Sequence, residues 1–560
     1  MTNGILLQDL PNLEVLDLGR SRNLIECPNV SGSPNLKYVT LEDCESVPEV
    51  DPSIFLLLKL EILSVLGCTS LKSLSSNTCS PAFRELNAMF CDNLKDISVT
   101  FASVDGLVLF LTEWNGNELP SSILHKKNLT RLVFPISDCL VDLPENFSDE
   151  IWLISQRSCE HDPFITLHKA LPSPAFRSVK RLTLYNAPLL SEIPNNISLL
   201  SSLEYLTLSG LIIRSLPETI KYLPQLKLLS VFNCKMLQSI PQLSPPLCLF
   251  VLWNCESLEK VLSSSEPSEK PRCGFLLLNC IKLDPHSYQT VLNDAIEKIE
   301  LVAKVFLENA FVYGHAWHFL PAMPGMENWF HYSSTQVSVT LELPSNLFGF
   351  AYYVVLSQGH MGFGVDFGCE CFLDNNSGER VYITSFAKTS FLGWLVRFNP
   401  SIHMMSDHLV FWYDGGSCKQ IMEAVEEIKA INDVNNTSNN PKLTFRFFIH
   451  ENIYDEVAIK ECGFRWMYKE ETVALTISES HKEEEIVSSS DFQSNDQEEI
   501  VPPTNFESDD LEETIPPRNK LKLDMFGTPL SNLELDETYD LRYIIFLTVI
   551  IGSAQFYVTT

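Results

Sequence analysis

The cysteine and histidine side chains are the first candidates for chemistry in this 560-residue chain. Cys159, His161 and His168 fall within ten residues of one another, and both residue types are common zinc ligands. A structural zinc site needs four ligands, usually in closely spaced pairs, and this spacing fits no such set. We therefore expect these side chains to belong to an ordinary polar loop, and we predict no metal site.

Two further histidine groups lie in the second half of the chain. His315 and His318 are three residues apart, and His403 and His408 lie close to Asp407. Nucleophilic catalysis also needs a nucleophile in a strained turn, and the pattern G-x-S-x-G does not occur in the sequence. The phosphate-binding pattern G-x-x-x-x-G-K-[ST] is absent as well. We interpret these histidines as surface or strand-end residues, and we expect a non-enzymatic protein with no cofactor.

The elements that position these residues begin with a repeated leucine pattern. L-x-x-L-x-L opens at Leu203 and recurs, with conservative exchanges, at Leu13, Leu36, Leu60, Phe83, Val104, Leu129, Val179, Leu226 and Leu247. The steps between regular openings are 23, 24, 23, 21 and 25 residues, and then 24, 23 and 21. A period of about 20–29 residues with this pattern is typical of leucine-rich repeats. We predict an α/β solenoid of leucine-rich repeats over residues 8–262, irregular at 138–178, where an island loop and two eroded repeats remain open.

Cysteines share one position of this repeat. Each of five cysteines follows the first apolar residue of its repeat by eight positions: Cys44, Cys68, Cys91, Cys234 and Cys255. Equivalent positions of a solenoid stack in a column, and a small, weakly polar side chain packs well inside it. We expect reduced, structural thiols. With an amino terminus that shows no signal-peptide pattern, this favours a reducing, cytoplasmic compartment.

The strand positions between the leucines should form an exposed, concave sheet. On this face we place eight candidate ligand-binding residues: Tyr38, Arg84, Phe90, Tyr185, Tyr205, Phe232, Asn233 and Trp253. Tyr185, Phe232 and Trp253 share, together with Met89, the position just after the last strand leucine. Scattered exposed apolar residues need no function. An aligned aromatic column is better explained by a protein-binding face, since Tyr and Trp dominate binding hot spots.

The sequence changes character after residue 262. For residues 263–311 we predict a polar linker, a last strand near 274–284 and an amphipathic helix at about 286–310 that covers the end of the solenoid. Residues 312–472 contain short runs rich in Val, Ile, Phe and Tyr, predicted as strands at 336–343, 348–357, 367–374, 408–414, 442–450 and 463–468. Strands punctuated by Pro, Gly and Asn indicate an all-β, antiparallel sandwich.

The tail has two parts. Residues 473–540 are predicted to be disordered, because residues 471–540 hold 19 acidic and 4 basic side chains and few aromatics. Residues 541–560 are hydrophobic, and 543–558 carry no charge but fall just short of a membrane-spanning helix. A membrane anchor, a non-functional hydrophobic extension and a short docking strand remain open. The net charge of −31 argues against nucleic-acid binding, which needs clustered Lys and Arg.

Several stretches resemble a known family. Residues 216–261, LPETIKYLPQLKLLSVFNCKMLQSIPQLSPPLCLFVLWNCESLEKV, look like the last repeats of plant intracellular immune receptors of the TIR, nucleotide-binding and leucine-rich-repeat class. FLLLNCIKLD matches the segment after those repeats. PGMENWFHYSSTQVSVTLELP, followed by GFAYYVVLS, SDHLVFWYD and KECGFRWMY, resembles the post-repeat jelly-roll/Ig-like domain called C-JID. The resemblance covers roughly residues 10–468.

The chain departs from the family pattern in two ways. Its proline-glycine to tryptophan-phenylalanine stretch is two residues short, and it contains no TIR and no nucleotide-binding (NB-ARC) domain. The resemblance implies a module that recognises a pathogen effector or a host guardee, in the cytoplasm or nucleus. One alternative is a regulatory or decoy adaptor that pairs with a full-length receptor through an uncapped first repeat. A membrane-tethered repeat scaffold is the other.

Overall fold

The computed structural model describes residues 10–469, apart from residues 102–105, 115–117, 125–128, 146, 155–161, 244–246, 263–273, 309–314, 362–365, 375–379, 389–401, 435–440 and 451–455. The predicted acidic segment 473–540 and the hydrophobic segment 541–560 lie outside the described residues. No helix in the described ranges is long and apolar enough to cross a membrane, and residues 543–558 were not part of them.

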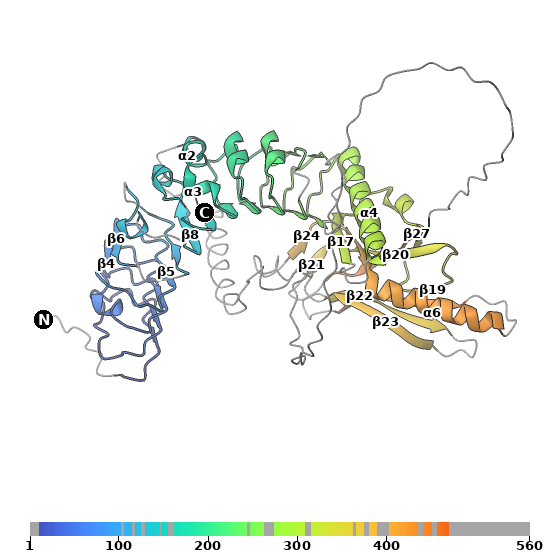
Figure 1. Cartoon of the computed structure of the whole chain (residues 1–560), viewed down its shortest axis with the longest axis horizontal. Helices are drawn as coiled ribbons and strands as arrows, with labels where there is room; N and C mark the ends of the chain where they lie inside the picture. Colours follow the sequence, from blue (N-terminus) through green and yellow to red (C-terminus); the bar gives the residue numbers. More distant parts are fainter. Residues whose placement is uncertain are drawn as a thin grey trace, which may run out of the picture.

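The repeats form an arc of short parallel strands, each in register with the next (Figure 1). In spatial order they are β1 (Val15–Asp17), β2 (Tyr38–Thr40), β3 (Ile62–Ser64), β5 (Glu85–Asn87), β7 (Val108–Phe110), β8 (Arg131–Pro135), β9 (Glu150–Ile154), β10 (Arg181–Tyr185), β11 (Tyr205–Ser209), β12 (Leu228–Phe232), β14 (Leu249–Trp253) and β16 (Gly274–Leu278). Within a strand, side chains alternate between the solenoid interior and the concave face. On β11, for example, the inward-facing Leu206 and Leu208 are 1% and 0% exposed. Tyr205, which precedes Leu206 and faces the other way, is only half-buried.

Short elements on the other sides of the arc complete each turn. They are η1 (Pro52–Ile54), α1 (Ser121–Leu124), η2 (Asp138–Asp142), α2 (Pro163–Ala170), α3 (Pro174–Arg177), η3 (Asn195–Leu199) and η4 (Glu218–Tyr222), with the strand pairs β4 (Ser73–Ser76)–β6 (Asp96–Val99) and β13 (Ser239–Ile240)–β15 (Lys260–Val261). In Figure 1 the strands of the long sheet line the inner side of the arc, and α2 lies on its outer side. The core therefore runs along the arc between these two layers.

The register corrects the predicted repeat phase at one point. Val108 pairs with Glu85 on one side and with Arg131 on the other, so the steps are 23 and 23 residues (85 to 108 to 131). The opening placed at Val104 is therefore wrong by two residues. The irregular stretch 138–178 also contains a full repeat, because β9 pairs in register with both β8 and β10 while α2 and α3 replace the usual short turn.

The cysteine column lies inside the solenoid as the repeat spacing predicted. The thiols of Cys44, Cys68 and Cys91 donate to carbonyl oxygens of the preceding repeat at 3.2, 3.1 and 3.1 Å. Burial raises the pKa of the Cys68 thiol to about 12, so it stays protonated and unreactive at neutral pH. These thiols satisfy one backbone carbonyl in each turn.

The sheet does not end with the repeats. Helix α4 (Pro285–Glu308) follows β16, and β17 (His315–Pro321) then returns to pair parallel with β16 through Phe275–His318 and Leu276–Phe319. From β17 the same sheet continues antiparallel through β25 (His408–Asp414), β20 (Leu347–Leu356), β27 (Ile459–Tyr468) and β18 (Tyr332–Ser334). Strand β17 was not predicted, and it joins the repeats to the following region as one continuous sheet.

A second antiparallel sheet packs against this extension. Its order is β19 (Ser338–Leu341), β26 (Lys442–His450), β22 (Asp366–Asp374) and β23 (Arg380–Lys388). Aromatic rings fill the space between the sheets: Phe445 lies 4.6 Å from Phe464 and Trp412 lies 6.4 Å from Phe447, measured between ring centroids. The strands β21 (Gly359–Met361) and β24 (Ile402–Met404) form a separate pair, and η5 (Met326–Trp329) precedes β18.

The region after residue 312 is not purely β. Helix α6 (Gly415–Val434) follows directly on β25 and contacts β20, β23 and β25. No helix was predicted between the strands at 408–414 and 442–450. The expectation of an all-β region is therefore corrected, because one face of this helix is buried at Cys418, Ile421 and Val425.

Candidate recognition surface

The predicted aromatic column exists, but its carboxyl-terminal members are buried. Tyr185, Ser209, Phe232 and Trp253 occupy one register position on β10, β11, β12 and β14. Tyr185 is half-buried, whereas Phe232 and Trp253 are only 6% and 5% exposed. Their rings meet edge to face at 6.1 Å, and both belong to the main hydrophobic core. As the structure stands, they act as packing residues and are not exposed anchors.

The register explains this burial. The next residue in the same row is Leu278 of β16, which is 1% exposed. Asn279, the residue after it, contacts β24 and the residue that follows β24: its side-chain amide donates to His403 O at 2.7 Å, and its side-chain carbonyl oxygen accepts from Met405 N at 2.9 Å. The row of concave residues thus ends where the repeat sheet meets the antiparallel sheets. We call this region the junction.

Phe90 and Asn233 lie in the turns that follow the strands, and this corrects their predicted place on the strand face. Their φ angles are 55° and 53°, in the left-handed region that asparagine and glycine tolerate best. Asn254 and Asn279 occupy the equivalent turns, with φ angles of 54° and 58°. The Asn254 amide donates to Asn233 at 2.9 Å, and the Asn279 amide donates to Asn254 at 2.8 Å. These asparagines form a ladder that leads into the junction.

Tyr38 and Arg84 both bond to Glu61, which lies on the repeat between them. The Tyr38 hydroxyl and the Arg84 Nε donate to the same Glu61 oxygen, at 3.2 and 3.1 Å. Ion pairs link other neighbouring repeats at the same position: Lys37–Glu14 at 3.0 Å, Lys180–Asp149 at 3.1 Å and Lys227–Glu204 at 2.7 Å. Exposed pairs of this kind add little stability because solvent screens their charges.

The accessible aromatic residues of the middle repeats gather on β10 and β11. The Arg181 guanidinium lies 4.9 Å from the centre of the Tyr205 ring, on the adjacent strand. Tyr185, at the other end of β10, is half-buried, and burial raises the pKa of its hydroxyl to about 12. Arg181 and Tyr205 therefore form a cation–π pair, and Tyr185 lies four residues further along β10, packed against an apolar cluster. Tyr and Arg are the residue types enriched at protein interfaces.

An apolar cluster on the concave side was not predicted from the sequence. It is separate from the solenoid core and consists of Met89, two residues after β5, together with residues of β7, β8 and β9: Val108, Phe110, Val133, Trp152 and Ile154. We call it the concave apolar patch. At its edge the Arg131–Glu150 ion pair, at 3.1 Å, is 18% and 12% exposed, and Trp152 Nε1 donates to Glu150 at 2.7 Å. The sequence pattern that could have predicted this cluster is the row of apolar residues at outward positions of β7, β8 and β9.

Two histidines predicted at the surface lie in the core of the junction. His318 and His408 are both 0% exposed. His318 Nδ1 accepts from the backbone N–H of Phe275 at 3.1 Å, and His408 Nε2 accepts from that of Asn279 at 3.1 Å. Both acceptors satisfy backbone donors of β16 and of the turn after it, so these histidines have a structural role. His315 and His403 are exposed, as expected.

Among the described residues, one histidine group resembles a catalytic set, and it is a helix cap. Asp414 Oδ2 lies 2.6 Å from His315 Nδ1, and Asp414 accepts from both the backbone N–H, at 2.7 Å, and the hydroxyl of Ser417. A nucleophilic serine would donate to the imidazole, whereas this serine donates to the carboxylate. Asp414 immediately precedes α6, and these bonds satisfy the first turn of that helix.

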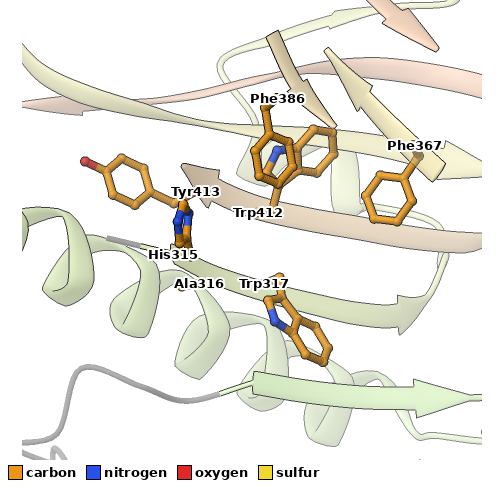
Figure 2. Close-up of a pocket in the computed structure, with 7 residues that line it drawn as sticks. All are labelled: His315, Ala316, Trp317, Phe367, Phe386, Trp412 and Tyr413. Atoms are coloured by element: carbon orange, nitrogen blue, oxygen red, sulfur yellow. The ribbon is translucent and has the colours of Figure 1, made fainter. Parts of the chain in front are cut away.

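A pocket beside this cap is too small for a substrate. Figure 2 shows its lining, in which Phe386 stacks on Trp412 with centroids 6.0 Å apart; the other lining residues are His315, Ala316, Trp317, Phe367 and Tyr413. Its volume of about 10 Å³ corresponds to no more than one water molecule. Elsewhere, His168 is exposed on α2, while Cys159 and His161 lie outside the described residues. Within the described ranges, no group of three or more His, Cys, Asp or Glu side chains is arranged to hold a metal.

The repeated register, inward leucines and concave strands define a leucine-rich-repeat protein. No protein-family model matches the chain. It is 26% identical over 469 residues to the disease resistance-like protein DSC1 of Arabidopsis thaliana, covering 78% of this chain and 35% of that protein. It is also 26% identical over 288 residues to the disease resistance protein RML1B of A. thaliana (51% and 22%) and 25% identical over 399 residues to the TMV resistance protein N of Nicotiana glutinosa (60% and 34%).

The resemblance to plant disease resistance proteins is therefore confirmed along most of the chain. The chain spans about a third or less of the length of these relatives. A solved leucine-rich-repeat protein of Leptospira interrogans covers 48% of this chain and 73% of its own at 15% identity and a TM-score of 0.21, which is too low to support an argument. The repeat assignment here rests on the strand register itself.

Proposed function

We propose that this chain is a non-enzymatic protein-recognition module of a plant intracellular immune receptor, which binds a pathogen effector or a host guardee. The observation that carries the proposal is the group formed by Tyr185, Arg181 and Tyr205 on a concave parallel sheet. Similarity to plant disease resistance proteins over 78% of the chain supports the immune setting. The proposed location is the cytoplasm or the nucleus.

The proposed binding surface differs from the one expected from the sequence. Six of the predicted residues keep accessible surface and remain candidates: Tyr38, Arg84, Phe90, Tyr185, Tyr205 and Asn233. Phe232 and Trp253 occupy the same row as Tyr185 but are buried, so we do not propose them as direct contacts. The antiparallel sheets after the repeats, which we propose to be a C-JID domain over residues 312–472, would supply the second part of the surface because β17 extends the repeat sheet directly.

An interaction screen with matched tyrosine variants tests this proposal. The full chain would be screened by co-precipitation against secreted pathogen proteins expressed in leaves. For a partner found in this way, Tyr205→Ala should weaken binding by about fivefold or more, because truncating an important interface aromatic costs more than about 1 kcal/mol. Tyr222→Ala is the control, since Tyr222 is 64% exposed on η4, away from the concave strands. Equal binding by both variants and the unsubstituted chain would contradict the proposed surface.

A further inference from the structure

Two histidines face each other across the short antiparallel strand pair β21–β24. His360 of β21 lies directly opposite His403 of β24. Their ring centroids are 4.4 Å apart, the ring planes are inclined by 44°, and both side chains are exposed. The two residues are far apart in the sequence, so their spacing did not predict this contact. The fold thus places two imidazoles side by side at the surface.

The backbone bonds of these residues explain why the rings are so close. The His360 N–H lies 3.5 Å from a Glu456 carboxylate oxygen, and His360 O accepts from Glu456 N at 3.0 Å. On the other strand, His403 O accepts from the side-chain amide of Asn279 at 2.7 Å. These backbone groups point away from the facing strand, so His360 and His403 form a non-hydrogen-bonded pair. In such a pair the opposed Cα atoms are only about 4.5 Å apart and the side chains are closest.

The neighbours of the two histidines fix their direction. Met404, next to His403, is 0% exposed, and alternation along the strand therefore turns His403 towards solvent. Gly359, just before His360, has a φ of 144°, and a Cβ added there would lie 3.1 Å from the Glu456 Cβ. Glu456 therefore packs closely against β21 while it bonds the backbone of His360. Both histidines are held by their backbones, which leaves their rings available to a ligand.

We propose that His360 and His403 together bind a divalent transition-metal ion of the zinc type. Imidazole is the commonest metal ligand in proteins and suits zinc. Zn–N bonds of about 2.0–2.1 Å at a tetrahedral angle hold the two nitrogens about 3.3 Å apart. Ring nitrogens lie on the ring perimeter, so rings with centroids 4.4 Å apart reach this separation by rotating about their side-chain bonds. The proposal does not depend on the recognition function.

The ion would have two protein ligands. Among the described residues no third His, Cys, Asp or Glu is placed to join the pair, so water would complete the coordination. The charges around the strand pair favour a cation. Asp407 accepts from Gln358 N at 3.1 Å and is paired with Lys460 at 2.7 Å. Glu456 makes no ion pair within the described part of the chain, so its negative charge remains available to attract the ion.

A bound ion would link β21 to β24 at the junction. Strand β24 is already tied to the last repeat through Asn279, which is 1% exposed. In Figure 1, β21 and β24 lie on the inner side of the arc, near the end of the repeat sheet. The metal would therefore brace the contact between the repeats and the region that follows them. Because it would bind the folded chain and not the separated strands, zinc should also raise the thermal stability of the protein.

Zinc titration of the full chain, after treatment with a chelator, tests the proposal. His360→Ala and His403→Ala each remove one ligand, and His286→Ala removes an exposed histidine of α4 as the matched control. The bonds to Glu456 and Asn279 survive the two site substitutions, because they use main-chain atoms of the histidines. In calorimetry with ZnCl2, the unsubstituted chain and the control should bind about one equivalent more than either site variant. Equal binding by all four proteins, or a loss in only one site variant, would overturn the proposal.

Chemical labelling of the unsubstituted chain gives a second readout that does not rely on variants. Diethyl pyrocarbonate modifies imidazole nitrogens that carry neither a proton nor a metal, and mass spectrometry reads the extent at each histidine. We expect zinc to reduce labelling of His360 and His403 together by severalfold, with no change at His286, and EDTA to reverse the effect. Labelling of the pair that ignores zinc, or that falls equally at His286, would overturn the proposal as well.

Discussion

His408 Nε2 accepts a hydrogen bond from the backbone N–H of Asn279 at 3.1 Å, although 129 residues separate them in the sequence. The other ring nitrogen of His408 lies 2.8 Å from the carbonyl oxygen of Ser406, which requires Nδ1 to carry the proton. His318 makes the equivalent bond to Phe275, four residues before Asn279. Two neutral imidazoles thus hold the last repeat strand and its turn against the antiparallel sheets.

Stability should fall as the pH drops below 6.5. Burial lowers the pKa of His408 to about 4, and burial followed by the charge of Lys298 lowers the pKa of His318 well below its usual value. Each imidazole is neutral when folded and takes up a proton on unfolding, so its contribution is complete above pH 6.5 and is lost as the pH falls towards 4. For His408 alone the contribution is about 3 kcal/mol. Urea unfolding at pH 7.5 and 5.0 measures it.

The His408→Gln variant gives the matched comparison. It can keep a hydrogen bond to Asn279 but has no proton to take up in this range, so its unfolding free energy should depend less on pH between 6.5 and 5. An unchanged pH dependence in this variant would show that another group is responsible.

Asn279 should be more sensitive to substitution than a typical turn residue. It is 1% exposed, and its side chain bonds Asn254, the carbonyl of His403 and the amide of Met405. Asn279→Gly keeps the left-handed backbone but leaves buried partners unsatisfied, which should cost about 1–3 kcal/mol. Asn279→Ala should cost roughly 1 kcal/mol more, because of the φ angle of 58°. Chemical denaturation of both variants checks the order, and equal stabilities would contradict the backbone contribution.

Trp253 and Tyr205 should respond differently to truncation. Trp253→Ala removes a buried ring that packs against Phe232, so it should destabilise the protein by about 3–5 kcal/mol. Tyr205 is half-buried, and Tyr205→Ala should cost less than about 1.5 kcal/mol while affecting ligand binding. Thermal unfolding measured beside binding separates the two effects. If the Trp253→Ala protein were as stable as the unsubstituted chain but did not bind the ligand, Trp253 would be a direct ligand contact after all.

Amide exchange should be uneven along the repeats. Strand β1 pairs with β2 over three residues only, and Val15 is 55% exposed. In contrast, β11 is paired in register along five residues with both β10 and β12. Hydrogen exchange of the chain should therefore be fast over about residues 10–50 and slow around 203–237. Uniformly slow exchange from residue 10 onward would show that the first repeat is as stable as the central ones.

Local patterns in the sequence determined much of the repeat region. The spacing of leucines placed most of the strands, and the inward position of Leu206 and Leu208 follows from simple alternation. The shared position of the cysteines predicted their stacking, and the apolar period between residues 286 and 310 predicted α4 closely. These features depend on residues a few positions apart, and a linear sequence displays such relationships directly.

Only the tertiary structure decided which outward positions are accessible. Phe232 and Trp253 follow the same strand pattern as Tyr185, yet they are buried because their row continues to Leu278 and the junction. His318 pairs with a residue 43 positions away and His408 with one 129 positions away. Burial and hydrogen-bond partners of this kind arise from chain segments brought together by folding, and neither period nor composition in the sequence contains that information.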